Sequence, residues 1–499
     1  MKTFIKIIST GLLLTGLAAT QASCKKFLEE DPKNLVTIQN YYQTQADAIA
    51  AVNSIYAYLN SVNNFDAGGN TAGVYHSTFW VTAGLSSDEL LNNQLGAANF
   101  DQLANFTYTS QNSSLEEIWG MHYKTIFTAN IAITRIPGIS MNESLRARLV
   151  GEAKFLRGLM YFNLVRMFGD IPLLLEENNP LTPSETKADD VYAQIVKDLE
   201  DAAAVLPLSY DPGNGRGRAT SGAANSLLAK VYLTQKNWQQ AADHAKKVID
   251  SHQYDLWENY ADAFKLSSRG GKEAVFSVGF GDGGGAIIFW EVGQFNVRLL
   301  PTALSVEGVQ NAQGWQIPTE YVYNAFDADD QRRAVTFITE VHDPAGPTTT
   351  IRPYIQKYWD RVAEPRANSS ANDFPVIRYA DVLLIYAEAS NELNNTVDAH
   401  EYINKIRKRA RFNGTTYMNA VPDYNGLPKE QFRDAILKER MMEFVGEGQR
   451  WFDLVRTGKL EQQVPLAKPG VTPAARNYLF PLPQRELDLN KSLSQNTGY

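Results

Sequence analysis

Aromatic side chains in two asparagine-, glycine-, serine- and threonine-rich stretches, residues 63–115 and 257–374, could stack on a ligand. The face of an aromatic ring packs against the apolar face of a sugar, while nearby amides can bond its hydroxyls. The sequence therefore predicts a stacking platform for sugars or other amphipathic ligands. The alternative is that these rings form the core of the loops. Our candidates are Trp80, Phe289, Trp290, Trp315 and Trp359, followed by Tyr75, Phe79 and Trp257.

Three glutamates near the C-terminus could support a different chemistry. Glu439, Glu443 and Glu447 would line one helical face if the helix continued past Gly446, and like charges at that spacing repel unless cations lie among them. Two interpretations are open: ion pairs between helices, or a catalytic carboxylate pair. A glycosidase needs two acids flanking an open cleft, so the sequence favours ion pairs.

Other catalytic signatures are missing from the sequence. The six histidines, at positions 76, 122, 244, 252, 342 and 400, have no metal-ligand spacing. The glycine-rich run at residues 279–285 lacks the lysine and the following hydroxyl of a phosphate-binding loop, and no G-x-S-x-G elbow occurs. We therefore expect no metal, no cofactor and no enzymatic activity.

Cys24 is the only cysteine, and it follows a stretch typical of an export signal. Two lysines precede an apolar run at residues 7–19 that is too short to span a bilayer comfortably. Small residues then lead to Cys24, as at lipoprotein cleavage sites, although Gln21 stands where such sites usually have an apolar residue. The sequence predicts a signal peptide over residues 1–23, and lipid on Cys24.

Residues 24–35 would then form a solvated, charged tether between the lipid and the body at residues 36–499. Acyl chains contribute about 0.8 kcal/mol per buried CH₂, so several of them hold a protein firmly on a membrane. The alternative is plain secretion with an unpaired thiol.

The composition indicates a globular body, with 44% hydrophobic, 20% charged and 11% aromatic residues. Loss of residues 1–23 removes two lysines and no acids, which takes the net charge from −8 to −10. This negative charge argues against nucleic acid or anionic lipid as the main partner. Without a second cysteine, stability must come from a buried core.

Apolar residues recur with helical period in several segments, so the body is expected to be mainly α-helical. Gly169 and Pro172 would end one of these helices. Within the larger insertion, residues 274–278 have the composition of a short β-strand. The predicted helical segments are residues 40–62, 116–136, 144–168, 188–206 and 220–236.

One internal repeat has the spacing of a tetratricopeptide unit, in which small residues let two antiparallel helices approach. The pattern at residues 228–248 recurs at residues 386–406, about 150 residues later, which excludes a continuous solenoid. We expect helical pairs interrupted by long insertions. A peptide-binding assembly adaptor is therefore an alternative function, and it requires an open concave helical face.

Several motifs, taken in order, give the sequence a resemblance to a known family. They are Phe155-Leu156-Arg157 with Gly169-Asp170-Ile171-Pro172, the segment 376–389, Leu437-Lys438-Glu439-Arg440 with the segment 447–456, and the ending 495–499. Together these motifs resemble the SusD/RagB family of outer-membrane nutrient-binding lipoproteins of the Bacteroidota. The resemblance spans nearly the whole mature chain, with an N-terminal part at about 36–235 and a C-terminal part at about 257–499.

The resemblance implies a SusD-like fold of tetratricopeptide-like helical pairs with loop insertions that contain short strands and carry the ligand site. It also implies a lipid anchor outside the outer membrane and a SusC-like TonB-dependent transporter as partner. The protein would capture oligosaccharides or other nutrients and deliver them unchanged. A surface glycoside hydrolase is the less favoured alternative. The segment 376–389 resembles a hallmark helix of the family. Apolar residues lie on all sides of this expected helix, so Arg378 and Asp381 require charge partners, and the two residues could pair with each other.

Overall fold

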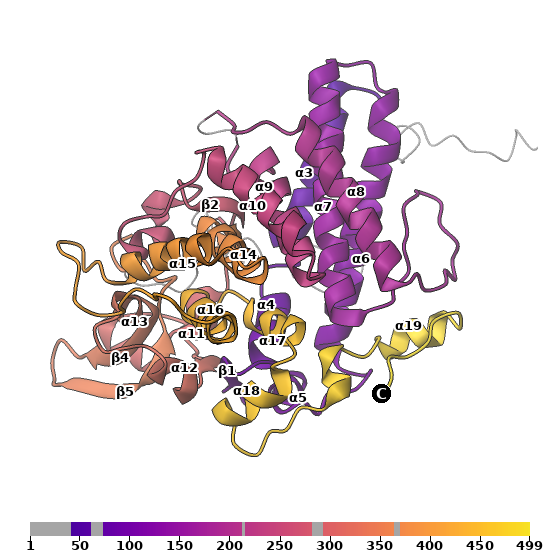
Figure 1. The fold of residues 1–499 in the computed structure, drawn as a ribbon. Coiled ribbons are helices and arrows are strands. Elements are labelled where there is room, and N and C mark those ends of the chain that lie inside the picture. Colours follow the sequence, from indigo (N-terminus) through magenta and orange to yellow (C-terminus); the bar gives the residue numbers. More distant parts are fainter. Residues whose placement is uncertain (1–40, 61–72, 212–214, 282–292, 364–369) are drawn as a thin grey trace, which may run out of the picture.

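The structure is a computed structural model that describes residues 41–60, 73–211, 215–281, 293–363 and 370–499. Long helices form the upright bundle seen at the right of Figure 1. They are α3 (Gln45–Asn60), α6 (Ser113–Arg135), α7 (Glu143–Phe168) and α8 (Ala188–Val205). These four helices and α9 (Ser221–Thr234) confirm the five predicted segments.

The helix α7 shows how local sequence sets the bounds of these elements. The side chain of Asn142 accepts a hydrogen bond from the backbone N–H of Leu145, which satisfies one of the free donors of the first turn. The helix ends at Gly169, whose φ of +76° is a conformation that a side chain disfavours. Its C-terminal half is almost entirely buried between α6 and α8, so it serves as the central helix of the bundle.

Two helical hairpins form where the repeated pattern occurs. The first is α9 with α10 (Trp238–Asp250), and the second is α14 (Tyr379–Glu392) with α15 (Thr396–Ala410). Although they are distant in the sequence, the hairpins are neighbours in space, because α10 packs against α14. Nearly every residue of α14 is buried, since α9, α10, α15 and α16 (Lys429–Glu443) surround it. The expected helical pairs are therefore present.

In the described parts of the chain, the insertions contribute most strands of three two-stranded antiparallel sheets. β1 (Leu90–Asn92) pairs with β3 (Gln316–Pro318), β2 (Ala274–Val278) with β6 (Phe374–Arg378), and β4 (Phe337–His342) with β5 (Thr348–Ile355). The strand predicted at residues 274–278 is confirmed as β2.

The expectation of one helix over residues 376–389 is wrong at its start. Residues 374–378 form β6, and the helix α14 begins only at Tyr379. The extended conformation is held by pairing with β2, and the Tyr379 N–H donates to the Glu273 carbonyl at 2.9 Å. Long-range strand pairing thus decides the conformation of an apolar segment that could form either element.

Shorter helices complete the described chain. The α-helices are α4 (Thr78–Leu85), α5 (Ala98–Asn105), α11 (Phe295–Leu299), α12 (Glu320–Asn324), α13 (Gln331–Thr336), α17 (Arg450–Arg456), α18 (Leu460–Ala467) and α19 (Gln484–Leu489). The 3₁₀-helices are η3 (Ile136–Gly138), η4 (Tyr260–Phe264), η5 (Leu266–Ser268), η6 (Thr302–Glu307) and η7 (Ala475–Tyr478). No helix within the described ranges is both long enough and apolar enough to cross a membrane.

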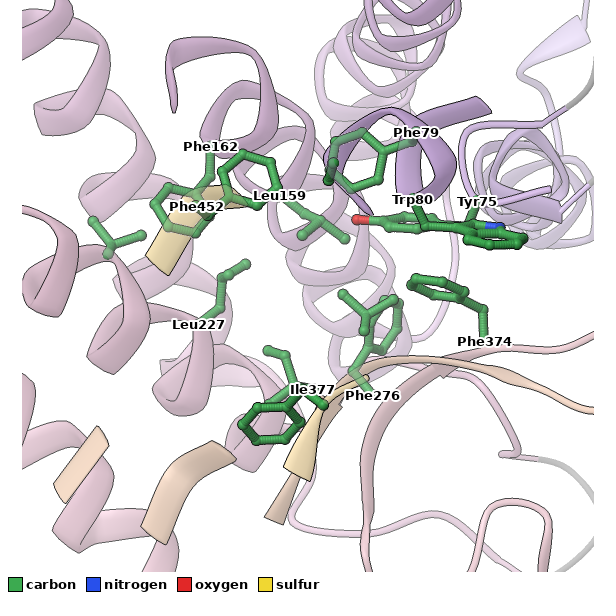
Figure 2. Close-up of a cluster of buried hydrophobic side chains, with 14 of the residues drawn as sticks. Tyr75, Phe79, Trp80, Leu159, Phe162, Leu227, Phe276, Phe374, Ile377 and Phe452 are labelled. Carbon is green, nitrogen blue, oxygen red and sulfur yellow. The ribbon is translucent and has the colours of Figure 1, made fainter. Parts of the chain in front are cut away.

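One large hydrophobic core joins the N-terminal and C-terminal parts of the chain. Figure 2 shows Phe79 from α4, Phe162 from α7, Phe374 from β6 and Phe452 from α17 in the same cluster of buried side chains. The rings of Phe79 and Phe452 lie 5.9 Å apart, although more than 370 residues separate them in the sequence. The two parts therefore depend on each other for burial of their apolar surface.

Candidate functional site

The glutamates of the C-terminal motif lie in a buried network of ion pairs. Arg332 and Arg407 each bind Glu439 at 2.6 Å, and Lys357 binds Glu447 at the same distance. All five of these side chains are at least 94% buried. The helix α16 ends at Glu443, so Glu447 does not continue the helical face but reaches the network from the turn that follows. The predicted inter-helix ion pairs are present.

Glu443 has the most cationic surroundings in this network. Its carboxylate accepts hydrogen bonds from Arg332, Arg378 and Arg409. Burial by itself would raise the pKa of Glu443, but the three arginines outweigh burial and lower the pKa to about 2. The group is therefore ionised at neutral pH and acts as a fixed charge.

The suggested pairing of Arg378 with Asp381 is wrong. Arg378 donates instead to Glu273, Glu443 and Glu447, while Asp381 is held by Lys230 and Arg440, each at 2.8 Å. Because the helix begins between the two residues, Arg378 extends from a strand and Asp381 from the first turn of α14. The close spacing in the sequence therefore does not bring the two side chains together.

These acids lack the open cleft that a carboxylate pair would need for catalysis. Glu439 and Glu443 have fully buried side chains, and arginines occupy their oxygens. A substrate could reach them only after several ion pairs had been broken. Histidine, cysteine, aspartate and glutamate form no cluster suited to a metal ion within the part of the chain that the structure describes.

The structure places Trp80 in the hydrophobic core. This residue has no exposed surface, its ring lies 5.4 Å from that of Phe295, and its Nε1 donates to the His76 carbonyl. Gly448 passes so close that an added Cβ would lie 2.8 Å from the Trp80 Cβ. Tyr75 and Phe79 are also buried, in the cluster of Figure 2. These three rings present no free face to a ligand in this structure.

Trp315 and Trp359 lie in two other environments. Trp315 is half-buried beside β3, with the guanidinium of Arg298 at 5.2 Å from its ring. Trp359 is only 9% exposed and packs in a small separate core beneath β4 and β5, with Arg361 over its ring. Trp80, Trp315 and Trp359 therefore do not form one continuous aromatic surface.

Phe289 and Trp290, like Cys24, lie outside the described residues, but the ends of their segment are defined. It leaves the body after β2 and returns at Gly293, which forms a two-way backbone pair with Ser370. Nearby, Asn60 donates to the Gly279 carbonyl at 3.0 Å, and Arg216 lies 3.9 Å from Asp373. The described residues that flank residues 61–72, 212–214, 282–292 and 364–369 thus lie close to one another.

This region contains a groove of about 820 Å³ along β2 and the described part of the connection between α8 and α9. We name it the β2 groove. Its lining includes several cationic and aromatic residues. They are Tyr210, Arg216, Arg218, Tyr254, Arg269, Lys272 and Phe276.

Two cations of the β2 groove are already paired. Arg218 binds Glu152 at 2.7 Å, and Lys272 binds Asp255 at 3.1 Å. Arg216 and Arg269 lie near Asp373, which lines a small pocket beside the groove. With aromatic rings and polar groups converging on an open hollow, the groove has the features of a carbohydrate-binding site.

Comparison with known proteins identifies the family to which this helical binding fold belongs. Residues 331–499 match the model of the SusD family, and residues 26–233 match a model described as starch-binding associating with outer membrane. SusD-like protein P25 of Formosa agariphila is 30% identical over 96% of this chain and 97% of its own length. SusD-like protein P2 of the same organism is 31% identical over 97% and 98%. The chain belongs to the SusD family, as its motifs predicted.

Solved structures share the same fold. A laminarin binding SusD-like protein is 26% identical, with a TM-score of 0.76 over 92% of this chain and 100% of its own. Surface glycan-binding protein A of Bacteroides thetaiotaomicron, in complex with laminarihexaose, has a TM-score of 0.75 at 22% identity, over 91% and 100%. The predicted mainly helical SusD-like fold is confirmed. Members of the family include proteins named as starch-binding, laminarin binding and surface glycan-binding, which agrees with the expected binding role.

Sequence reasoning did not find Asp373, Arg216 or Arg269. None of them belongs to a motif, and Arg269 and Asp373 stand 104 positions apart in the sequence. Trp257 was a secondary candidate because of its residue type, and the structure places it half-buried at the wall of the Asp373 pocket. Pairing of β2 with β6 brings Arg269 and Asp373 together, and no local sequence pattern predicts that pairing.

Proposed function

We propose that the protein is a cell-surface lipoprotein that captures glycans in the β2 groove and delivers them to a SusC-like TonB-dependent transporter. The observation that carries this proposal is family membership along nearly the whole chain, together with an open groove where the insertions converge. Relatives named for starch and laminarin binding support glycans as the ligand class.

Phe289 and Trp290 are the aromatic residues that we assign to this site. They belong to the insertion that follows β2, whose described ends lie beside Asn60 and Ser370. Trp315 remains a separate candidate for a second contact, because it is half-buried rather than enclosed. Stacking by one or two rings would supplement the polar contacts of the groove.

The competing functions have less support. An adaptor that binds peptides on a concave helical face needs that face open, but α14 is enclosed by α9, α10, α15 and α16. A hydrolase needs accessible paired acids, and the acids of the C-terminal motif are buried among arginines.

Direct binding and turnover measurements test the proposal. Purified protein is titrated calorimetrically with starch, laminarin and other plant, host and storage glycans, and the bound glycan is then incubated with the protein and assayed for new reducing ends. We expect saturable binding without product. Sustained release of reducing ends by clean protein would contradict assignment as a binding protein.

The anchor is tested by replacing the cysteine. Cys24→Ala should release the folded protein from the outer membrane without weakening glycan binding, because the lipid would be separated from the body by the predicted tether at residues 24–35. Membrane fractionation in a strain that lacks the transporter provides the measurement. If the variant stayed in the membrane fraction there, lipid on Cys24 would not be the anchor.

A further inference from the structure

A small pocket opens from the β2 groove toward the interior. Its volume is about 40 Å³, and it shares Arg269, Gly270, Ala274 and Ser277 with the groove. A cavity needs about 10–15 Å³ of such volume to hold one water molecule, so the pocket admits a group of a few non-hydrogen atoms and not a sugar ring. Whatever enters it must project from a larger ligand in the groove.

Most ionic groups that line this pocket already have partners. Glu273 and Arg378 bind each other at 2.5 Å, and Glu273 also binds Arg409. Lys265 binds Asp262 at 2.6 Å. The charges of these groups are already balanced by ion pairs, so they do not require a ligand.

Asp373 is different. Its side chain is only 8% exposed, yet neither carboxylate oxygen has a hydrogen-bond partner among the described residues. The Nε of Arg216 is 3.9 Å from Oδ2, which is too long for a hydrogen bond. Burial raises the pKa of Asp373, and Arg216 and Arg269 counteract this rise, as does the Phe280 N–H, which lies near the carboxylate but outside hydrogen-bond geometry. A buried carboxylate without a hydrogen-bond partner is costly, so we expect a ligand or a water molecule to supply the donor.

Arg269 lacks an acceptor in the same pocket. Its Nη1 donates to the Ala371 carbonyl at 2.8 Å, but its buried Nε has no partner among the described residues. An unfilled acceptor and an unfilled donor therefore line one small space. A hydroxyl group can donate to the first and accept from the second, which neither a carboxylate nor an ammonium can do.

The charges around the pocket select against ionic ligands. The guanidinium groups of Arg216 and Arg269 disfavour an ammonium group or a metal ion, and the carboxylate of Asp373 disfavours sulfate or a uronic acid. Trp257 forms part of the wall and provides apolar surface for a methylene group. A neutral hydroxyl on a short carbon arm matches the size and the polarity of the site.

We propose that this pocket binds the primary hydroxyl group of a hexose unit, so that the protein selects neutral glycans with free hydroxymethyl groups. The proposal rests on the glycan capture proposed above. In the absence of ligand, a water molecule would fill the pocket, and the hydroxymethyl arm of the sugar would replace it.

Two matched probes test the selection. Cellohexaose and xylohexaose have the same β-1,4 backbone, and only cellohexaose has hydroxymethyl groups. Laminarihexaose and maltohexaose extend the hexose set to other linkages. By calorimetry we expect at least one hexose hexasaccharide to bind, and xylohexaose to bind at least about tenfold more weakly, since hydrogen bonds to charged groups are lost. Xylohexaose binding as tightly as the best hexose oligomer would overturn the inference and leave glycan capture intact, whereas no binding of any oligosaccharide would contradict glycan capture itself.

Variants test the residues. Asp373→Ala should weaken binding of the hexose oligomer at least about tenfold and leave any xylohexaose binding unchanged. Asp434→Ala is the matched control, because Asp434 is 73% exposed and lies on α16, outside the groove lining. Asp373→Asn keeps the shape of the side chain and serves if the alanine variant does not fold. Hexose affinity equal to wild type in a folded Asp373 variant would overturn the assignment.

Discussion

Two sets of buried charges in this protein are built in opposite ways. Around Glu443, three arginines saturate the carboxylate, and every neighbouring acid also has a cationic partner. In the pocket beside the β2 groove, Asp373 is nearly as buried and has no hydrogen-bond partner within the described ranges. Because an isolated buried charge is costly, the first arrangement stabilises the fold, and the second is completed by a ligand.

The largest effect on stability is expected when one acid of the saturated network is neutralised. Glu443→Gln should lower the free energy of unfolding by about 3–5 kcal/mol, because the three arginines would then remain buried without sufficient negative charge. Urea denaturation followed by circular dichroism gives this value.

A matched control lies on the same helix. Glu430 is 78% exposed and pairs with Arg433 at the surface, so Glu430→Gln should change stability by less than about 1 kcal/mol. Equal effects of the two substitutions would show that burial and multiple pairing do not make Glu443 special.

Acid should weaken the same network in a defined range of pH. The pKa of Glu443 is lowered from 4.5 to about 2 in the folded protein, so its contribution is present above pH 4.5 and is lost as the pH falls toward 2. The loss from this group is about 3 kcal/mol. Urea denaturation at a series of pH values between 5 and 2 measures it, and Glu443→Gln should show a shallower decline than wild type.

Substitution of aromatic residues distinguishes a ring that binds ligand from a ring that only fills the core. Trp290→Ala should weaken glycan binding by about 1–3 kcal/mol without lowering the melting temperature. Trp80 is the contrasting position, because it is fully buried and Trp80→Ala should lower the melting temperature. Calorimetry and thermal denaturation of both variants give the result. Unchanged affinity in the Trp290 variant would direct the search for the stacking contact to Trp315 or Trp257.

Aromatic residues show the limit of what residue type and loop setting can predict. Trp80, Trp315 and Trp359 share a polar, glycine-rich sequence context, yet they are fully buried, half-buried and nearly buried, respectively. Trp80 packs on Phe295 from a distant insertion, and Trp359 packs in a separate small core. The exposure of each tryptophan depends on which distant segments pack against its ring. The local sequence does not predict that packing.

The sequence alone determined the helices, the family and the need for buried ion pairs. Helical periodicity is local, so α3, α6, α7, α8 and α9 lie at the predicted positions. The charged residues in the apolar segment 376–391 likewise indicated that charge partners must exist. Tertiary structure decided which partners these are. It gave Arg378 three glutamates in place of Asp381, turned residues 374–378 into a strand, and left Asp373 with no hydrogen-bond partner among the described residues. These outcomes depend on strands and helices that meet across about 65 to 105 residues of sequence, because burial and pairing are properties of the packed chain and not of any one segment.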